Sequence, residues 1–355
     1  MSESKKNEEV ILDVQELSTT FFTDEGVVPA VSKVSFKLHK GETLGIVGES
    51  GSGKTVTSKS LMRIIPNPPG RITGGKIMFH GKDLVRATDK EMEAVRGNQI
   101  AMIFQEPLTA LNPVFSIGWQ IDESLRLHQK ELGKVERRKR VLEMLEKVGI
   151  PSPKQRIDEY PHQLSGGMRQ RVMIAMALAC NPEVLIADEP TTALDVTIQA
   201  QVLRLIDNLK SELGTAVILI THDLGVVAEV CDRVLVMYAG QVVEEATVDD
   251  IFHRPTHPYT RALLKSIPKR GRRVPGAKFK TIEGMVPNIK KLPKGCRFQG
   301  RCDIEEERCR KEEPALVKLD RGQSSRCFFS DKLIAEAKSN EESTSNDESK
   351  GASDE

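Results

Sequence analysis

The chain has 355 residues, of which 29% are charged and 39% are apolar, and its formal net charge is +1. This length suffices for one large domain and a smaller one, and the near-neutral charge excludes a global field that would favour nucleic acid or an acidic partner. No apolar run approaches the roughly 20 residues of a membrane-spanning helix, and the polar residues 1–9 are unlike a signal peptide. We expect 1–9 to be disordered, the protein to be cytosolic, and any membrane role to depend on a partner.

The order of elements predicts an α/β fold with a helical insert. Residues 10–104 alternate short strand-like runs with turns, whereas residues 106–160 carry apolar side chains at helical spacing. Helices and strands then alternate from 165 to 240, which predicts a parallel sheet covered by helices. The clearest expected strands are Val10 to Leu17, Val31 to Leu38, Lys76 to Phe79, Val184 to Ala187, Ala216 to Ile220 and Val234 to Tyr238. The expected division is a cassette over 10–255, an extension over 256–330 and an acidic disordered tail over 331–355.

A phosphate-binding loop is the strongest motif. Residues 48–55 fit the pattern G-x-x-x-x-G-K-S/T, between an apolar run over 44–47 and a helical pattern over 56–65. Glycines let backbone N–H groups surround phosphate oxygens, and the helix N-terminus adds partial positive charge. Lys54 is expected to reach the β- and γ-phosphates of ATP, and Thr55 to place its hydroxyl on Mg²⁺. The expected nucleotide-binding residues here are Gly48, Glu49, Ser50, Gly51, Ser52, Gly53, Lys54, Thr55 and Val56.

Polar residues at the ends of other predicted strands supply groups for hydrolysis. Asp188 follows a buried strand and offers a carboxylate to Mg²⁺, and Glu189 is placed to polarise water. His222 follows the next predicted strand, and Gln105 follows another apolar run, from which its amide would sense Mg²⁺ and the water. These residues predict an ATP-hydrolysing site.

A second anion-binding helix start lies far from the first in the sequence. Ser165, Gly166 and Gly167 open a predicted helix, where a hydroxyl and free N–H groups favour phosphate. One nucleotide does not need two such anion-binding helix starts in the same chain. The second is therefore expected to serve a nucleotide held by another subunit.

Taken in order, these motifs resemble the ATP-binding cassette of ABC transporters over about residues 10–250. The resemblance implies a P-loop ATPase with a mixed or parallel sheet, an antiparallel β subdomain and a helical subdomain over 106–160. It implies that Glu189 is the general base, that His222 contacts the γ-phosphate, and that Lys54 and Gln105 assist. Ser165 to Gly167 would then bind the partner subunit's ATP, and Asp195 would lie in the loop that crosses the dimer.

The resemblance also implies an aromatic residue that stacks on adenine. Phe21 matches that place, and Phe22 is a close rival. The signature departs from the family's common form at Met168, where glutamine is usual. Because the preceding three residues carry the anion grip, we expect activity to be retained.

The sequence around the motifs is similar to that of one ATPase subunit of oligopeptide and dipeptide importers. The segments 164–171, 187–201, 257–264 and 284–287 carry this similarity. It implies transport of di- or oligopeptides, or of nickel, with two membrane permease subunits, a paralogous ATPase subunit and an extracellular solute-binding protein. The protein would then lie on the cytoplasmic face of the membrane. The alternatives are a soluble ABC ATPase acting on nucleic acid or ribosomes, and a subunit that binds ATP without hydrolysing it; single-cassette organisation and the catalytic residues argue against them.

Four cysteines are clustered near the C-terminus with the spacing C-x5-C-x6-C-x17-C. They are Cys296, Cys302, Cys309 and Cys327. Four thiolates suit tetrahedral zinc or an iron–sulfur cluster of the 4Fe-4S type, and the paired knuckles usual for zinc are absent. The family resemblance also favours the iron–sulfur cluster, and buried thiols without metal remain an alternative. We expect a metal here to replace a missing apolar core in a loop-like segment.

Overall fold

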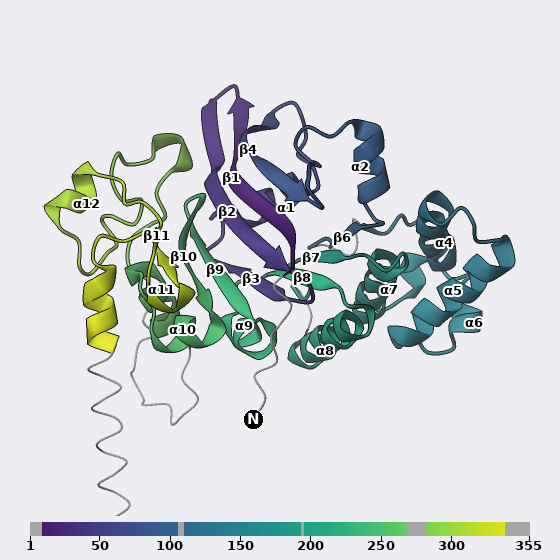
Figure 1. Cartoon of the computed structure of the whole chain (residues 1–355). Coiled ribbons are helices and arrows are strands. Elements are labelled where there is room, and N and C mark those ends of the chain that lie inside the picture. The colour runs from purple at the N-terminus through teal and green to yellow at the C-terminus, as the bar shows by residue number, and fades with distance from the viewer. Residues whose placement is uncertain (1–8, 106–109, 193–194, 268–281, 338–355) are drawn as a thin grey trace, which may run out of the picture.

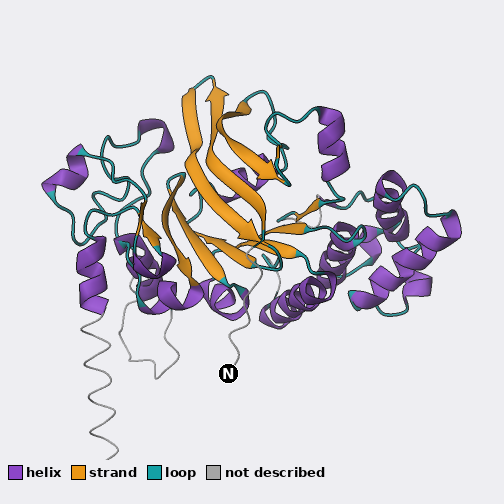
Figure 2. Ribbon diagram, viewed as in Figure 1, coloured by secondary structure: helices purple, strands orange, loops and turns teal. Residues whose placement is uncertain are grey.

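The computed structural model describes residues 9–105, 110–192, 195–267 and 282–337. Two β-sheets occupy the centre, with a helical lobe on one side and the C-terminal extension on the other (Figure 1). Figure 2 shows that helices flank the larger sheet. Parts of five expected segments lie outside the described residues: 1–8 of the N-terminus, 106–109 of the helical insert, 193–194 of the cassette, 268–281 of the extension and 338–355 of the tail.

The smaller sheet is antiparallel and has the strand order β2-β1-β4-β5. Its strands are β1 (Val10–Thr23), β2 (Gly26–His39), β4 (Gly70–Phe79) and β5 (Lys82–Asp83). The expected strands in this region are present, but β1 and β2 are longer than their apolar runs because backbone pairing continues to Thr23 and Gly26. One face packs on α1 and the larger sheet, so apolar side chains from both sheets share a core.

The larger sheet carries the expected parallel strands and has the order β11-β12-β10-β9-β3-β8-β7-β6. The five strands from β9 to β6 are parallel, and the other three are antiparallel. The bounds are β3 (Thr43–Val47), β6 (Ile100–Ile103), β7 (Val184–Asp188), β8 (Ala216–Ile220), β9 (Arg233–Tyr238), β10 (Gln241–Thr247), β11 (Val317–Lys318) and β12 (Ser324–Ser325). Every residue of β3, β7 and β8 is buried, as expected for parallel strands covered on both faces.

Helices surround this sheet and build the lobe. Their bounds are α1 (Lys54–Leu61), α2 (Asp89–Val95), α4 (Ile117–His128), α5 (Lys134–Lys147), α6 (Pro153–Arg156), α7 (Gly166–Leu178), α8 (Val196–Leu213), α9 (Leu224–Val230), α10 (Val248–His253), α11 (Pro258–Ser266) and α12 (Glu307–Lys311), with 3₁₀ turns η1 (Pro161–Gln163), η2 (Ile289–Lys291) and η3 (Asp320–Gly322). The lobe forms because α4 and α5 bury apolar faces against each other and α7. No described helix combines the length and apolar character that crossing a bilayer requires.

The extension is joined to the cassette by both backbone pairing and a shared core. β12 pairs with β10, so two short strands of the extension continue the central sheet. Phe298 and Tyr259 pack in one apolar cluster with Tyr238 and other residues of β9. The expectation that the extension lacks an apolar core is therefore wrong. The predicted disorder of 331–355 also differs at its start, because 331–337 are helical and Leu333 is buried.

Candidate nucleotide-binding and hydrolysis site

The phosphate loop connects β3, in the middle of the parallel strands, to α1. Gly48 has a φ of 151°, and a Cβ atom there would lie 2.2 Å from the carbonyl oxygen of Met237 and 2.8 Å from Ser52 Oγ. Gly53 has a φ of 99°, and its Cβ would lie 2.7 Å from the carbonyl oxygen of Ala30. Both positions therefore require glycine, and the tight packing beneath the loop fixes its path.

Lys54 lies buried at the start of α1 and its ammonium is held by the loop. Nζ donates to the carbonyl oxygens of Gly48 at 2.8 Å and Glu49 at 3.1 Å. Burial lowers the pKa of Lys54, whereas the carboxylates of Glu189, Asp188 and Glu49 oppose that change. The structure thus brings the predicted lysine together with both predicted carboxylates.

Asp188 and Thr55 form the oxygen-rich part of the site. Thr55 Oγ1 donates to Asp188 Oδ1 at 3.2 Å, and Ser58 Oγ donates to Oδ2 at 3.4 Å. Burial raises the pKa of Asp188, because a charged carboxylate is unfavourable there without a cation. A hydroxyl and a buried carboxylate are ligands of the kind that Mg²⁺ prefers. The residues therefore fit the cation that the sequence predicts.

Glu189 lies where three segments meet. Its Oε2 accepts a hydrogen bond from Gln105 Nε2 at 3.1 Å and from Thr192 Oγ1 at 2.9 Å. His222 Nδ1 lies 3.6 Å from Oε1, and the backbone N–H of Glu189 donates to the carbonyl oxygen of Ile220 at 2.9 Å. These contacts hold Glu189 in a left-handed conformation, with a φ of 47°. The structure thus unites the three predicted residues and adds Thr192, whose position three residues after the carboxylate was the only sequence signal for it.

The second anion-binding motif opens α7. Ser165 is the N-cap, and its side chain accepts from the backbone N–H of Met168 at 3.4 Å. Ser165 and Gly166 are exposed, whereas Met168 is partly buried against the core of the lobe. α7 packs on α4, α5, α8 and β6, whereas α1 packs on β1, β2 and β7. α7 therefore begins in the helical lobe and α1 beside the antiparallel sheet and β7, so the two helix starts lie in different parts of the fold.

Asp195 caps the neighbouring helix α8. Its Oδ1 accepts from the backbone N–H of Ile198 at 2.9 Å. A Cβ atom at Gly167 would lie 3.2 Å from the side chain of Ile198, so the starts of α7 and α8 are adjacent. Asp195 thus has a local structural role as a cap, and its role at a dimer interface remains a prediction.

The two candidate aromatic residues lie at the far end of β1. Phe21 is half-buried, and a Cβ atom at Gly70 would lie 2.7 Å from its ring. Phe22 is 42% exposed, and the guanidinium of Arg71 lies 4.5 Å from its ring centroid. Neither ring is enclosed by the described structure. The assignment of adenine stacking to Phe21 rather than Phe22 stays a prediction. Val56, which was also predicted to bind the nucleotide, is partly buried against the core shared by the two sheets.

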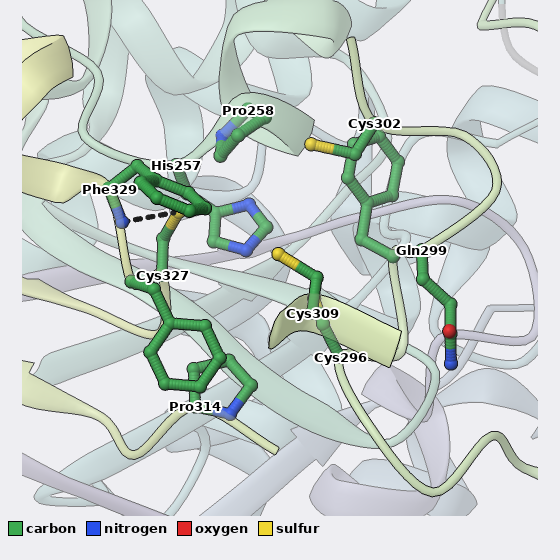
Figure 3. Close-up of a pocket in the computed structure, with 11 residues that line it drawn as sticks. His257, Pro258, Cys296, Gln299, Cys302, Cys309, Pro314, Cys327 and Phe329 are labelled. Atoms are coloured by element: carbon green, nitrogen blue, oxygen red, sulfur yellow. Dashed lines mark hydrogen bonds between the residues drawn. The ribbon is translucent and has the colours of Figure 1, made fainter. Parts of the chain in front are cut away.

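The four clustered cysteines all line one cavity in the extension, and each is a free thiol (Figure 3). Its other walls are mainly aromatic and proline side chains. Burial raises the pKa of Cys302 to about 12 and that of Cys327 to about 11. In the part of the chain that the structure describes, no group of three or more His, Cys, Asp or Glu side chains is arranged so that it could hold a metal ion. The cavity thus unites the predicted residues, but the metal itself is left without support.

Known proteins match the chain along almost its whole length. Residues 31–192 match the ABC transporter family, and residues 243–309 match the oligopeptide/dipeptide transporter C-terminal region. A probable peptide ABC transporter ATP-binding protein of Sinorhizobium fredii is 50% identical over 94% of this chain and 98% of its own. An oligopeptide transport ATP-binding protein of Bacillus subtilis is 52% identical over 92% and 98%. A dipeptide transport ATP-binding protein of Escherichia coli is 48% identical over 90% and 96%.

Solved structures agree with the fold. A dimeric ATP-binding cassette in a post-hydrolysis state with ADP and Pi is 28% identical, with a TM-score of 0.60 over 67% of this chain and 98% of its own. The matched share is close in length to the expected cassette, whereas the sequence relatives cover nearly the whole chain. The chain therefore belongs to the family of ATP-binding subunits of oligopeptide and dipeptide ABC transporters.

Proposed function

We propose that this chain hydrolyses ATP to power import of di- or oligopeptides through a membrane permease. The observation that carries the proposal is the junction of Glu189 with Gln105, Thr192 and His222 beside Lys54, in a member of the peptide-transporter family. Uptake of a labelled dipeptide should be restored to cells lacking this subunit by the wild-type chain and not by Glu189→Gln. Restored nickel uptake without dipeptide uptake would contradict the peptide assignment. The family membership favours this function over action on nucleic acid or ribosomes.

The chemistry follows from how the residues are held. The loop N–H groups and Lys54 would bind the triphosphate, and Thr55 and Asp188 would hold Mg²⁺. The cation, when bound, offsets the negative charge of the phosphates. Glu189 would take the proton from the attacking water, because Gln105 and Thr192 fix one carboxylate oxygen and leave the other beside His222. This arrangement orients the base before the nucleotide arrives.

Hydrolysis is proposed to require a paralogous ATP-binding subunit. Ser165, Gly166 and Gly167 would bind the nucleotide held by the partner, since they open a helix of the lobe that does not pack on α1 in the described structure. Asp195, at the start of the adjacent α8, would lie at the same interface. The complex would include two permease subunits and an extracellular solute-binding protein.

The helical lobe is proposed to contact the permease at the cytoplasmic face of the membrane, with the chain bound peripherally. Phe115 and Trp119 stack at 4.0 Å between ring centroids and remain 38% and 37% exposed. Exposed aromatic pairs are typical of protein interfaces. A photo-crosslinker at Trp119 should link to the permease, whereas the same group at Met285 in the extension serves as the control. Links from Met285 alone would contradict this contact.

We also propose that the cysteine cavity holds a 4Fe-4S cluster. Four free thiols around one largely apolar cavity support it, and the paired cysteine knuckles usual for zinc are absent from the sequence of this segment. Cys296, Cys302, Cys309 and Cys327 would be the ligands. Protein purified without oxygen should be brown and contain iron and sulfide, and Cys302→Ser should lose both while Cys180→Ser keeps them. Stoichiometric zinc, or no metal, would contradict the proposal.

A further inference from the structure

Glu49 of the phosphate loop is held by residues from the C-terminal extension. Both terminal nitrogens of the Arg301 guanidinium donate to the carboxylate of Glu49, Nη1 to Oε2 at 2.7 Å and Nη2 to Oε1 at 3.0 Å. The backbone N–H of Glu49 donates to the hydroxyl of Tyr259 at 2.8 Å. Its carbonyl oxygen accepts from Lys54 Nζ. Three separate groups of one loop residue are therefore anchored, two of them by residues more than 200 positions further along the chain.

Arg301 is itself rigidly placed. Its side chain is only 4% exposed, whereas that of Glu49 is 28% exposed. Arg301 also donates to the hydroxyl of Tyr238 at 3.2 Å and to the carbonyl oxygen of Glu283 at 3.0 Å. A planar guanidinium with several fixed partners holds a carboxylate in one orientation, which a flexible ammonium does not.

The charge of Glu49 explains why this anchor matters for ATP. A carboxylate in an anion-binding loop repels phosphate, and it lies close enough to Lys54 to act on that ammonium electrostatically. Without Arg301 the carboxylate would be an alternative partner for Lys54 and would compete with the phosphates. Arg301 neutralises the carboxylate and holds it in a two-point pair with the guanidinium.

We propose that Arg301 and Tyr259 are positioning residues for ATP binding: the extension uses them to hold Glu49, and through Glu49 the phosphate loop and Lys54, in the ATP-binding arrangement. This proposal rests on the nucleotide site described above. It assigns to the extension a part in ATP binding, because the contacts link it directly to the loop.

The test is the affinity of the full chain for a fluorescent ATP analogue, with four variants. Arg301→Ala should weaken binding about tenfold, because the partly exposed carboxylate of Glu49 loses its partner and becomes free to pair with Lys54. The affinity of Arg301→Lys should lie between those of the wild type and Arg301→Ala, since lysine keeps the positive charge but cannot donate two parallel hydrogen bonds to the carboxylate. The affinity of the double variant Glu49→Gln with Arg301→Ala should return to within about threefold of wild type, because the competing charge is gone while Tyr259 still accepts a hydrogen bond from the backbone N–H of residue 49. Tyr259→Phe should weaken binding a few-fold while keeping the packed ring.

Arg261→Ala is the matched control, since the ion pairs of Arg261 in the described structure are with Glu336 at 2.8 Å and Asp303 at 3.9 Å, not with the phosphate loop. In the assembled transporter, Arg301→Ala should raise KM for ATP more than it lowers kcat. The proposal is overturned if Arg301→Ala binds ATP as well as Arg261→Ala, or if the double variant is as weak as Arg301→Ala. If Arg301→Ala does not fold, the other two single variants decide. Wild-type affinity for the ATP analogue in both Tyr259→Phe and Arg301→Lys would overturn the proposal. Undiminished binding by Lys54→Ala would instead refute the nucleotide site itself.

Discussion

Phe298→Ala tests whether the extension folds with the cassette or as a separate module. Phe298 is 2% exposed, and its ring meets Tyr238 of β9 edge-on at 5.3 Å and Tyr259 of α11 at 5.4 Å. Removing a buried phenylalanine ring costs about 3–5 kcal/mol in free energy of unfolding, from lost apolar burial and the cavity left behind. Because Phe298 packs on a strand of the central sheet, we expect this cost to fall on the cassette as well.

The size of the effect can be worked out in degrees. The entropy of unfolding is about 2.1 cal/mol/K per residue, so a chain of 355 residues has about 0.7 kcal/mol/K. Dividing the loss of about 3–5 kcal/mol in unfolding free energy by this entropy gives a Tm lower by about 4–7 °C. Calorimetry should show one transition moved as a whole. Met285→Ala, at a side chain 90% exposed, should change stability by less than about 0.5 kcal/mol. Two transitions, with that of the cassette unmoved by Phe298→Ala, would refute the shared core.

Three further predictions concern the nucleotide site. Glu189→Gln should keep ATP binding and lower hydrolysis at least about 100-fold, measured as phosphate release by the assembled transporter, because the amide cannot accept a proton from water; normal turnover would exclude Glu189 as the base. Gly48→Ala should abolish ATP binding while the circular dichroism spectrum is retained, since its Cβ would lie 2.2 Å from the carbonyl oxygen of Met237; unchanged affinity would show that the loop can move aside. Phe21→Ala should weaken ATP binding about tenfold through lost stacking, and Phe22→Ala should not; the opposite order in nucleotide titrations would assign adenine stacking to Phe22.

The sequence was sufficient to predict which residues form the nucleotide site. Gly48 to Thr55, Asp188 and Glu189 are recognisable because phosphate binding and water activation demand particular residue types next to particular strands. The parallel strands were equally visible, since strands buried on both faces are continuously apolar, as Ala216 to Ile220 are. These signals are local, so they survive without knowledge of the fold.

Tertiary structure decided which distant residues share a task. Thr192 is an ordinary turn residue until the fold places its hydroxyl 2.9 Å from Glu189. Arg301 is one of many basic residues in its segment, and only the packing of the extension on β9 brings it to Glu49. The shared core around Phe298 was likewise invisible, because short segments rich in glycine and proline carry no periodic apolar pattern. Their burial depends on a surface that the rest of the chain provides, and a local pattern contains no information about that surface.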